Sequence, residues 1–160
     1  MGNDPVRRGT VPPAACGGPG GTLIAVPAAP SVDVIDETFL AVPRERVAAE
    51  FADPARWPSY WPDLRPEVAH DRGPAGIRWT LTGALTGTME VWCEQVLDGT
   101  VLHFFLRAEA PRRRRGNRAE SDRRHREFKA HAFALKRRLE GGRPAGVAPA
   151  GSGAPAGGEH

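Results

Sequence analysis

Residues 88–108 read TMEVWCEQVLDGTVLHFFLRA and hold the strongest structural signal in the chain. Apolar and polar side chains alternate on both sides of Asp98-Gly99, which is the pattern of two half-buried strands. Asp-Gly between two such runs favours a two-residue type I′ turn. The stretch therefore predicts a β-hairpin with strands at about 88–97 and 100–108.

This turn fixes which side chains share a face, because neighbouring residues of a strand point to opposite faces. Leu97 then lies opposite Thr100, and a five-residue loop at 83–87 adds a preceding strand at about 75–82. One face is apolar and comprises Ile77, Trp79, Leu81, Met89, Val91, Cys93, Leu102, Phe104 and Leu106. The opposite face is mixed and comprises Arg78, Thr80, Glu90, Trp92, Glu94, His103, Phe105 and Arg107. We expect the first face to be buried. The second, with its pairs Glu94/His103 and Glu90/Arg107, should be solvated and without a cleft.

Toward the N-terminus, Val32 to Val42 is rich in β-branched and aromatic residues and predicts another strand. Pro43 ends this strand and suits the first turn of a helix, which apolar spacing extends to Ala52. Residues 56–62 hold two tryptophans and a tyrosine between prolines, and they predict a short second helix. A strand at about 65–71 completes a sheet of about five strands.

Toward the C-terminus, Asp122 to Glu140 predicts a long helix that ends at Gly141-Gly142. Its apolar stripe comprises Phe128, Ala132, Leu135 and Leu139. The helix must bury this stripe, and the apolar face of the sheet is the available partner. The expected fold class is therefore α+β, with residues 31–140 as one domain. Residues 1–30 and 141–160 are rich in Gly, Ala and Pro and are predicted to be disordered tails.

Composition narrows the class of protein. The chain has 160 residues, a net charge of +3 and two cysteines, which are too few for a disulfide framework. No apolar run approaches the roughly 20 residues of a membrane helix, and the N-terminus lacks a signal-peptide pattern. We therefore expect a cytoplasmic protein.

Four segments of this pattern together resemble a known superfamily. They are Asp53-Pro54-Ala55-Arg56-Trp57-Pro58-Ser59-Tyr60-Trp61-Pro62, Ile77-Arg78-Trp79-Thr80-Leu81-Thr82-Gly83, Glu90-Val91-Trp92 and the amphipathic helix at 122–140. Their order resembles the helix-grip fold of the START-like superfamily (SRPBCC), and it is most similar to bacterial proteins of the polyketide cyclase/dehydrase and lipid-transport type. The resemblance implies a curved antiparallel sheet wrapped on the C-terminal helix, with a cavity between them for a lipid, sterol or polyketide. The chain has about five strands where the fuller fold has six or seven, which bears on the size of that cavity.

On this reading an apolar ligand site is lined by Trp57, Trp61, Trp79, Phe104 and Leu106. Ordinary core packing is the alternative for each of these side chains. His131 borders the helix stripe and is the one candidate for a catalytic polar group inside, with a solvent-edge histidine as the alternative. We expect a non-enzymatic binder or carrier, with a polyketide cyclase or dehydratase as the alternative. No metal or cofactor is expected, because metal-binding and nucleophile motifs are absent from the sequence.

A basic run, Arg112-Arg113-Arg114-Arg115, continues with Arg118, Arg123, Arg124 and Arg126. Interspersed acids and the lack of alternating aromatic residues favour a solvated loop. The alternatives, in order, are docking on an anionic membrane surface through Arg112–Arg115 and contact with nucleic acid. A second copy of the chain is a further candidate partner, through an open sheet edge or through the Trp92/Phe105 face.

Overall fold

The computed structural model describes residues 29–110 and 117–141. Its elements are β1 (Val32–Leu40), α1 (Arg44–Ala52), α2 (Trp57–Tyr60), β2 (Leu64–Asp71), β3 (Gly76–Gly83), β4 (Thr86–Val96), β5 (Gly99–Glu109) and α3 (Asn117–Glu140). Single turns of 3₁₀-helix at Pro54–Arg56 and Gly73–Ala75 precede α2 and β3. The expected tails lie almost wholly outside the described residues, as does the run Arg112-Arg113-Arg114-Arg115.

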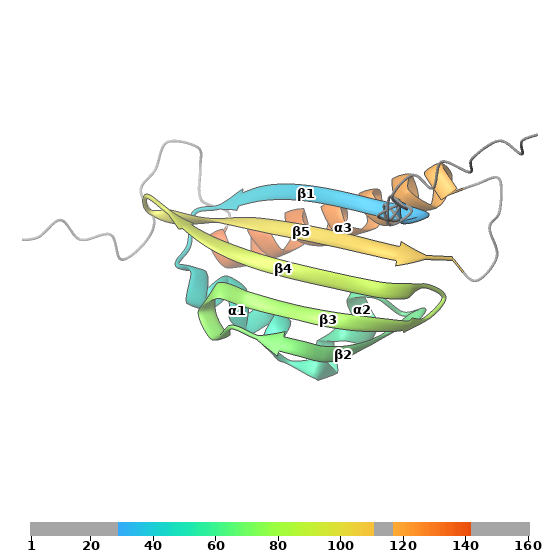
Figure 1. Cartoon of the computed structure of the whole chain (residues 1–160). Helices are drawn as coiled ribbons and strands as arrows, with labels where there is room; N and C mark the ends of the chain where they lie inside the picture. The colour runs from blue at the N-terminus through green and yellow to red at the C-terminus, as the bar shows by residue number, and fades with distance from the viewer. Residues whose placement is uncertain (1–28, 111–116, 142–160) are drawn as a thin grey trace, which may run out of the picture.

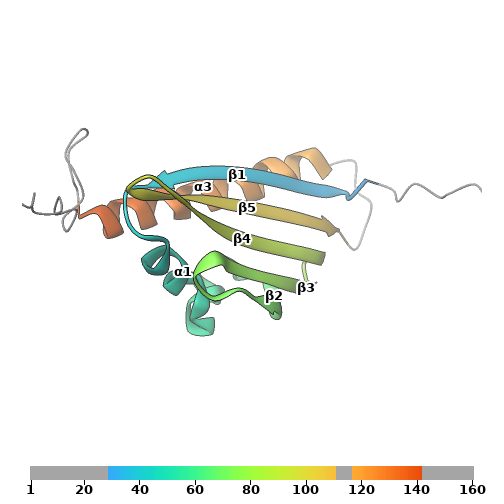
Figure 2. The same cartoon turned by 60° about the vertical axis from the view of Figure 1, so that its left-hand side comes forward.

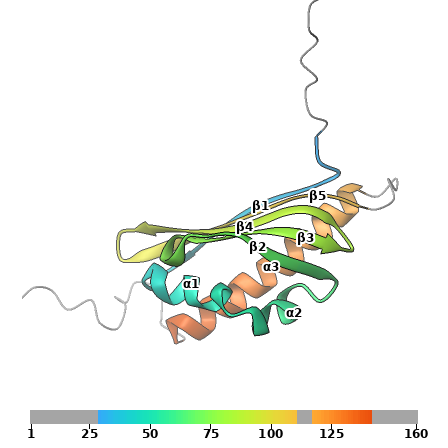
Figure 3. The same ribbon diagram turned by 60° about the horizontal axis from the view of Figure 1, so that its bottom comes forward.

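The strands form one antiparallel sheet in the order β1-β5-β4-β3-β2 (Figure 1). Figure 2 shows β1 beside β5 with α3 running along them, and Figure 3 shows that all three α-helices lie against one face of the sheet. The predicted architecture of five strands and a long C-terminal helix is confirmed. Within the described part of the chain, no helix has both the length and the apolar character needed to cross a membrane.

The face of the sheet that meets the helices, here called the inner face, forms the core. Along β1 the inward residues Val32, Val34 and Leu40 are buried, whereas alternate residues are exposed. The helix α3 contributes the buried residues Phe128 and Leu135 from its predicted stripe. Burial of each large apolar side chain contributes about 1.5–3 kcal/mol, so this face holds the sheet and the helices together.

The turn between β4 and β5 differs from its prediction. It consists of Leu97 and Asp98, and Leu97 has a positive φ of 52°. The predicted turn at Asp98-Gly99 is therefore wrong. Gly99 is needed for another purpose, because a Cβ there would lie 2.5 Å from the carbonyl oxygen of Leu40 and 2.5 Å from the Phe39 ring. The close approach of β1 thus requires the glycine that the turn would otherwise use.

Moving the turn by one residue shifts every cross-strand partner by two positions, which keeps each residue on its predicted face. Cys93, for example, lies opposite Leu102 instead of Phe104, and all three are buried. β3 and β4 are offset in the same way, with Thr80 opposite Thr88. The predicted division into two faces is therefore correct, although the predicted partners are wrong.

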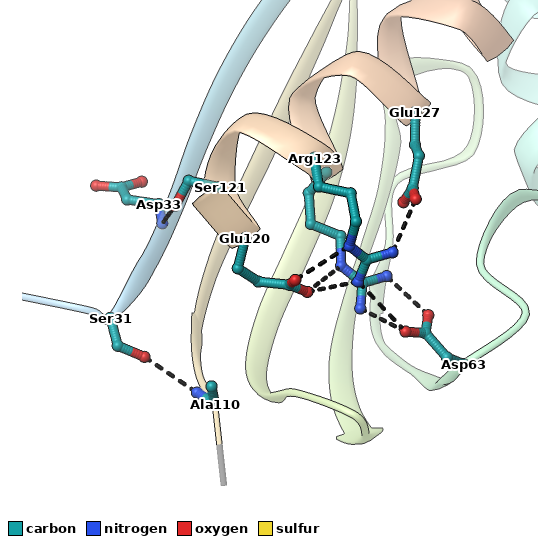
Figure 4. Close-up of polar contacts among 9 residues, drawn as sticks. Ser31, Asp33, Asp63, Ala110, Glu120, Ser121, Arg123 and Glu127 are labelled. Atoms are coloured by element: carbon teal, nitrogen blue, oxygen red, sulfur yellow. Dashed lines mark hydrogen bonds and ion pairs between the residues drawn. The ribbon is translucent and has the colours of Figure 1, made fainter. Parts of the chain in front are cut away.

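Side chains of α3 cover the free edge of β1. The backbone groups of this edge are bonded in four places at 2.7–3.2 Å: Asp33 N–H to Ser121 Oγ, Lys129 Nζ to Glu37 O, Lys136 Nζ to Phe39 O, and Ala41 N–H to Glu140 Oε1. Figure 4 shows Ser121 beside Asp33 at one end of this row. The contacts satisfy donors and acceptors that an edge strand otherwise leaves open.

The N-terminal half of α3 is fastened to the loop before β2. Arg124, whose side chain is 4% exposed, binds both oxygens of Asp63 through Nη1 and Nη2 at 2.7 and 2.6 Å. These bonds hold the pKa of the Asp63 carboxyl below its usual range. Arg123 joins Glu120 and Glu127 alongside (Figure 4). Arg123 and Arg124 therefore lie in the predicted C-terminal helix and form ion pairs, so the solvated-loop interpretation of the basic run is wrong for these two residues.

Candidate functional site

The interior between the sheet and the helices is filled by aromatic rings. The ring of Trp61 lies 5.5 Å from Trp79 and 6.5 Å from Phe104, measured between ring centroids. Trp57 packs edge-on against Trp79 at 5.7 Å, and Phe104 stacks on Phe128 of α3 at 3.8 Å. All five rings are buried. Four of the residues expected to line a ligand site are thus in contact with one another.

The segment around α2 places its tryptophans through local bonds. Asp53 Oδ1 accepts a hydrogen bond from the N–H of Ala55 at 3.0 Å, which caps the turn that leads into α2. Trp57 Nε1 donates to the carbonyl oxygen of Phe51 at 2.8 Å, so the polar atom of this indole is paired inside the core. Prolines on both sides restrict the backbone further. The segment is therefore a stiff cover over the inner face.

A small void lies between α3 and the α1–α2 segment. Its volume is about 10 Å³, close to the minimum for one water molecule. It is lined mainly by Phe51, Tyr60, Trp61, Phe128, His131 and Leu135. The Tyr60 and His131 rings meet edge to face at 5.4 Å. Of the predicted site residues, Trp61 and His131 border this void, and the others, Trp57, Trp79, Phe104 and Leu106, are buried outside its lining.

One polar atom of the aromatic group is unpaired. Trp79 Nε1 is buried and has no hydrogen-bond partner within the described residues. An unsatisfied buried donor costs about 1–3 kcal/mol. Trp79 is in ring contact with Trp61, which lines the void, whereas Trp79 itself does not.

A polar cluster that the sequence analysis missed lies between β1 and α3. The buried carboxylate of Asp36 contacts His125 Nε2 at 2.6 Å and Lys129 Nζ at 2.8 Å, and it accepts a hydrogen bond from Thr38 Oγ1 at 3.2 Å. A signal existed, because Asp36 and Thr38 occupy inward positions of β1 where apolar residues are expected. His125 and Lys129 also stand four residues apart on one face of the helix. The cluster fastens α3 to β1.

The opposite face of the sheet, here called the outer face, carries an aromatic stack around His103. Trp92 stacks on the His103 ring at 4.4 Å, and Phe105 lies parallel to that ring at 6.3 Å. The ring nitrogens Nδ1 and Nε2 contact Glu37 at 3.1 Å and Glu94 at 3.0 Å. Glu94 and His103 are thus in contact as predicted, although the register places Trp92, not Glu94, directly opposite His103. Glu37 of β1 is the second carboxylate partner of His103.

A groove of about 430 Å³ lies beside this stack on the outer face. Its walls include Arg72, Arg78, Glu90, Trp92, Phe105 and Arg107. The expectation that this face has no cleft is therefore wrong. The predicted pairing of Glu90 with Arg107 is also wrong, because the register places Glu90 opposite Arg78 on β3 and Phe105 on β5. Glu90 binds Arg72 and, at 2.6 Å, Arg78, whereas Arg107 lies 3.8 Å from Asp33.

No protein-family model matches the chain, and no curated protein matches it. Several solved structures do match. DR_A0006 from Deinococcus radiodurans has a TM-score of 0.54 and 15% identity, over 70% of this chain and 100% of its own. The Aha1 dimer from Colwellia psychrerythraea has a TM-score of 0.52 and 12% identity, over 71% of this chain and 99% of its own. DynU16, a protein of the dynemicin biosynthetic locus, has a TM-score of 0.50 and 18% identity, over 70% of this chain and 48% of its own.

Similarity at these identities bears on the fold and not on a ligand or a reaction. The matched structures and the observed arrangement agree with the resemblance carried by the Trp-Pro segment, the hairpin and the closing helix. This chain therefore has the helix-grip fold.

Proposed function

We propose that the protein binds an apolar small molecule, of the lipid or polyketide class, between the inner face of the sheet and α3. The observation that carries this proposal is the void beside Trp61, whose lining is apolar except for the Tyr60 hydroxyl and the His131 ring. Small-molecule sites are commonly apolar pockets with a few placed polar groups. The helix-grip fold supports the same position for a ligand, between the sheet and the C-terminal helix.

The closed arrangement leaves little room for such a ligand. Small-molecule pockets span about 300–1,000 Å³, whereas the void has about 10 Å³. Binding therefore requires side chains to move. Tyr60 and His131 are the side chains to do so, because they are partly exposed while the other lining residues are buried. Turning these two rings outward enlarges the void without unpacking the sheet.

The unpaired Trp79 N–H favours one kind of apolar ligand. A ligand carbonyl or hydroxyl oxygen that reached past Trp61 would accept this hydrogen bond and recover about 1–3 kcal/mol. A pure hydrocarbon would leave the donor unpaired. We therefore expect an apolar molecule with an oxygen acceptor within its apolar body, such as an aromatic polyketide or a sterol ketone.

Thermal unfolding with a ligand panel tests the proposal. The panel contains a fatty acid, a sterol ketone and an anthraquinone polyketide, and a ligand of the native state should raise Tm because it stabilises by RT ln(1 + [L]/Kd). Ala132→Leu fills the void and should abolish the rise, whereas Ala134→Leu, on the exposed side of α3, should retain it. Each variant is compared with its own unliganded Tm. If no compound shifts Tm, or if both variants respond equally, the proposal is wrong.

One observation favours the cyclase or dehydratase as a second candidate. His131 borders the void, and within the described residues its ring contacts the Tyr60 ring and forms no hydrogen bond or ion pair. Its ring nitrogens are therefore available for proton transfer to a bound substrate. His131→Ala should abolish turnover of a poly-β-ketone substrate while ligand-induced stabilisation persists. His70→Ala, an exposed histidine of β2, is the matched control, and turnover that survives His131→Ala would remove this candidate.

A further inference from the structure

The outer-face groove carries more positive than negative charge. Arg72, Arg78 and Arg107 line it, and Glu90 is the one carboxylate among its described lining residues. Arg72 and Arg78 each bind one oxygen of Glu90. Burial raises the pKa of Glu90, but these two bonds outweigh it and hold the pKa below the usual value. Glu90 is therefore ionised and already paired with Arg72 and Arg78. The groove lining still carries more guanidinium groups than carboxylates.

Some of these guanidinium donors have no acceptor. Arg72 Nε is buried and unpaired within the described part of the chain. Arg107 approaches Asp33 only to 3.8 Å, beyond hydrogen-bond range, and its side chain is 63% exposed. An anion in the groove would supply an acceptor to the exposed guanidinium group of Arg107.

Trp92 and Phe105 give the groove an aromatic wall. Gly76 lies opposite Trp92 on β3, so this strand offers no side chain to cover the indole. A Cβ at Gly76 would lie 2.1 Å from the carbonyl oxygen of Val91, which excludes other residues there. Trp92 is 37% exposed, and it stacks on His103, which is itself held between two carboxylates. The wall is therefore both accessible and fixed in orientation.

We propose that this groove is a second binding site, for a planar aromatic molecule that carries a carboxylate. The ring system lies against Trp92 and Phe105, where aromatic contacts add to the burial of apolar area. The carboxylate lies between Arg78 and Arg107, whose planar guanidinium groups match it in geometry and charge. The groove volume of about 430 Å³ falls in the range of about 300–1,000 Å³ found for small-molecule sites.

This site is independent of the interior function proposed above. The groove lies on the outer face, whereas the void lies between the inner face and α3. Filling the interior with Ala132→Leu should therefore leave the groove unchanged.

Titration calorimetry at low ionic strength tests the site, with 2-naphthoate as the probe. We expect saturable binding that 2-naphthylmethanol and cyclohexanecarboxylate do not reproduce, because each lacks one of the two recognised features. Arg107→Gln should weaken 2-naphthoate binding by about tenfold or more, and so should Trp92→Leu. Arg137→Gln removes the same charge from an exposed position on α3 and should leave the affinity unchanged.

Four results would overturn the proposal. They are the absence of 2-naphthoate binding, equal affinity in Arg107→Gln and Arg137→Gln, equal binding of the neutral alcohol, and loss of binding in Ala132→Leu. A single-stranded oligonucleotide that bound through Arg107 while 2-naphthoate did not would also assign the groove to another class of ligand. Far-UV circular dichroism and Tm confirm that each variant is folded.

Discussion

The two faces of the sheet use tryptophan in opposite ways. On the inner face, Trp79 is enclosed by other rings, and the neighbouring void holds about 10 Å³. On the outer face, Trp92 borders a groove of about 430 Å³ among arginines. The inner face offers an apolar lining but almost no free volume, whereas the outer face offers a larger free volume lined by charged side chains. An aromatic-rich face therefore indicates good packing before it indicates the capacity to hold a ligand.

The largest expected effect comes from truncating one tryptophan on each face. Trp79→Ala should lower the free energy of unfolding by about 3–5 kcal/mol, because it leaves a cavity in a packed core. Trp92→Ala removes an exposed ring and its stack on His103, which should cost about 1 kcal/mol. Urea unfolding followed by circular dichroism measures both values. Equal losses would show that the two faces contribute alike to stability.

Thiol reactivity gives a second comparison of the faces. Burial raises the pKa of the Cys93 thiol on the inner face to about 12. In a Cys16→Ser background, Cys93 should react with iodoacetamide roughly three orders of magnitude more slowly than a thiol introduced by Thr88→Cys on the outer face, because a free thiol has a pKa of about 8.5. Mass spectrometry follows both rates. The two thiols should react at similar rates only when the protein is unfolded in urea. Similar rates in the native protein would contradict the burial of Cys93 on the inner face.

The inner face also depends on α3 staying in place. Arg124→Met should lower the free energy of unfolding by about 1–2 kcal/mol at pH 7, a reduced value because the Asp63 side chain is 40% exposed. A carboxyl with a lowered pKa stabilises the fold above its unfolded pKa, near about 4, and this contribution is lost as the pH falls through the lower folded pKa.

The difference between wild type and Arg124→Met should therefore shrink below about pH 4. Urea unfolding at pH 7 and pH 3 measures it. Arg126→Met, an exposed substitution on the same helix, should change neither value. A difference that persisted at pH 3 would assign the loss to packing and not to the Asp63 carboxylate.

The smallest expected effect concerns the turn that sets the register of both faces. Leu97→Gly should raise the free energy of unfolding by about 0.5–1 kcal/mol, because glycine relieves the positive φ and the side chain it removes is 93% exposed. Gly99→Ala should instead destabilise, because its Cβ would meet the carbonyl oxygen of Leu40. Thermal unfolding of both variants tests the pair. Shifts of the same sign would refute the turn at Leu97 and Asp98.

The sequence predicted the faces better than it predicted the contacts. Alternation along β4 and β5 depends on each strand alone, so Cys93 and Leu102 were assigned correctly to the inner face. The register depends on how a third strand approaches, and the need for Gly99 beside Leu40 overrides the local preference of Asp98-Gly99. Local turn chemistry carries no information about that approach.

The candidate sites were harder to predict for a related reason. The aromatic residues Trp57, Trp61 and Phe104 could be assigned to one interior, but the volume left between them depends on how their rings pack. The outer groove depends on Arg72, which reaches from the β2–β3 connection to Glu90 on β4. Such contacts join residues that are distant in sequence, so the pattern of one strand does not reveal them.

The side chains that α3 lays along β1 have a consequence during synthesis. All five strands precede α3 in the chain, so they leave the ribosome before the helix does. Until α3 docks, the backbone groups on the free edge of β1 lack Ser121, Lys129 and Lys136 as partners. These backbone groups can then pair with a strand of another nascent chain. Docking of α3 ends that exposure. The interval between the release of β5 and the docking of α3 is therefore the time at which the edge of β1 is most open to another chain.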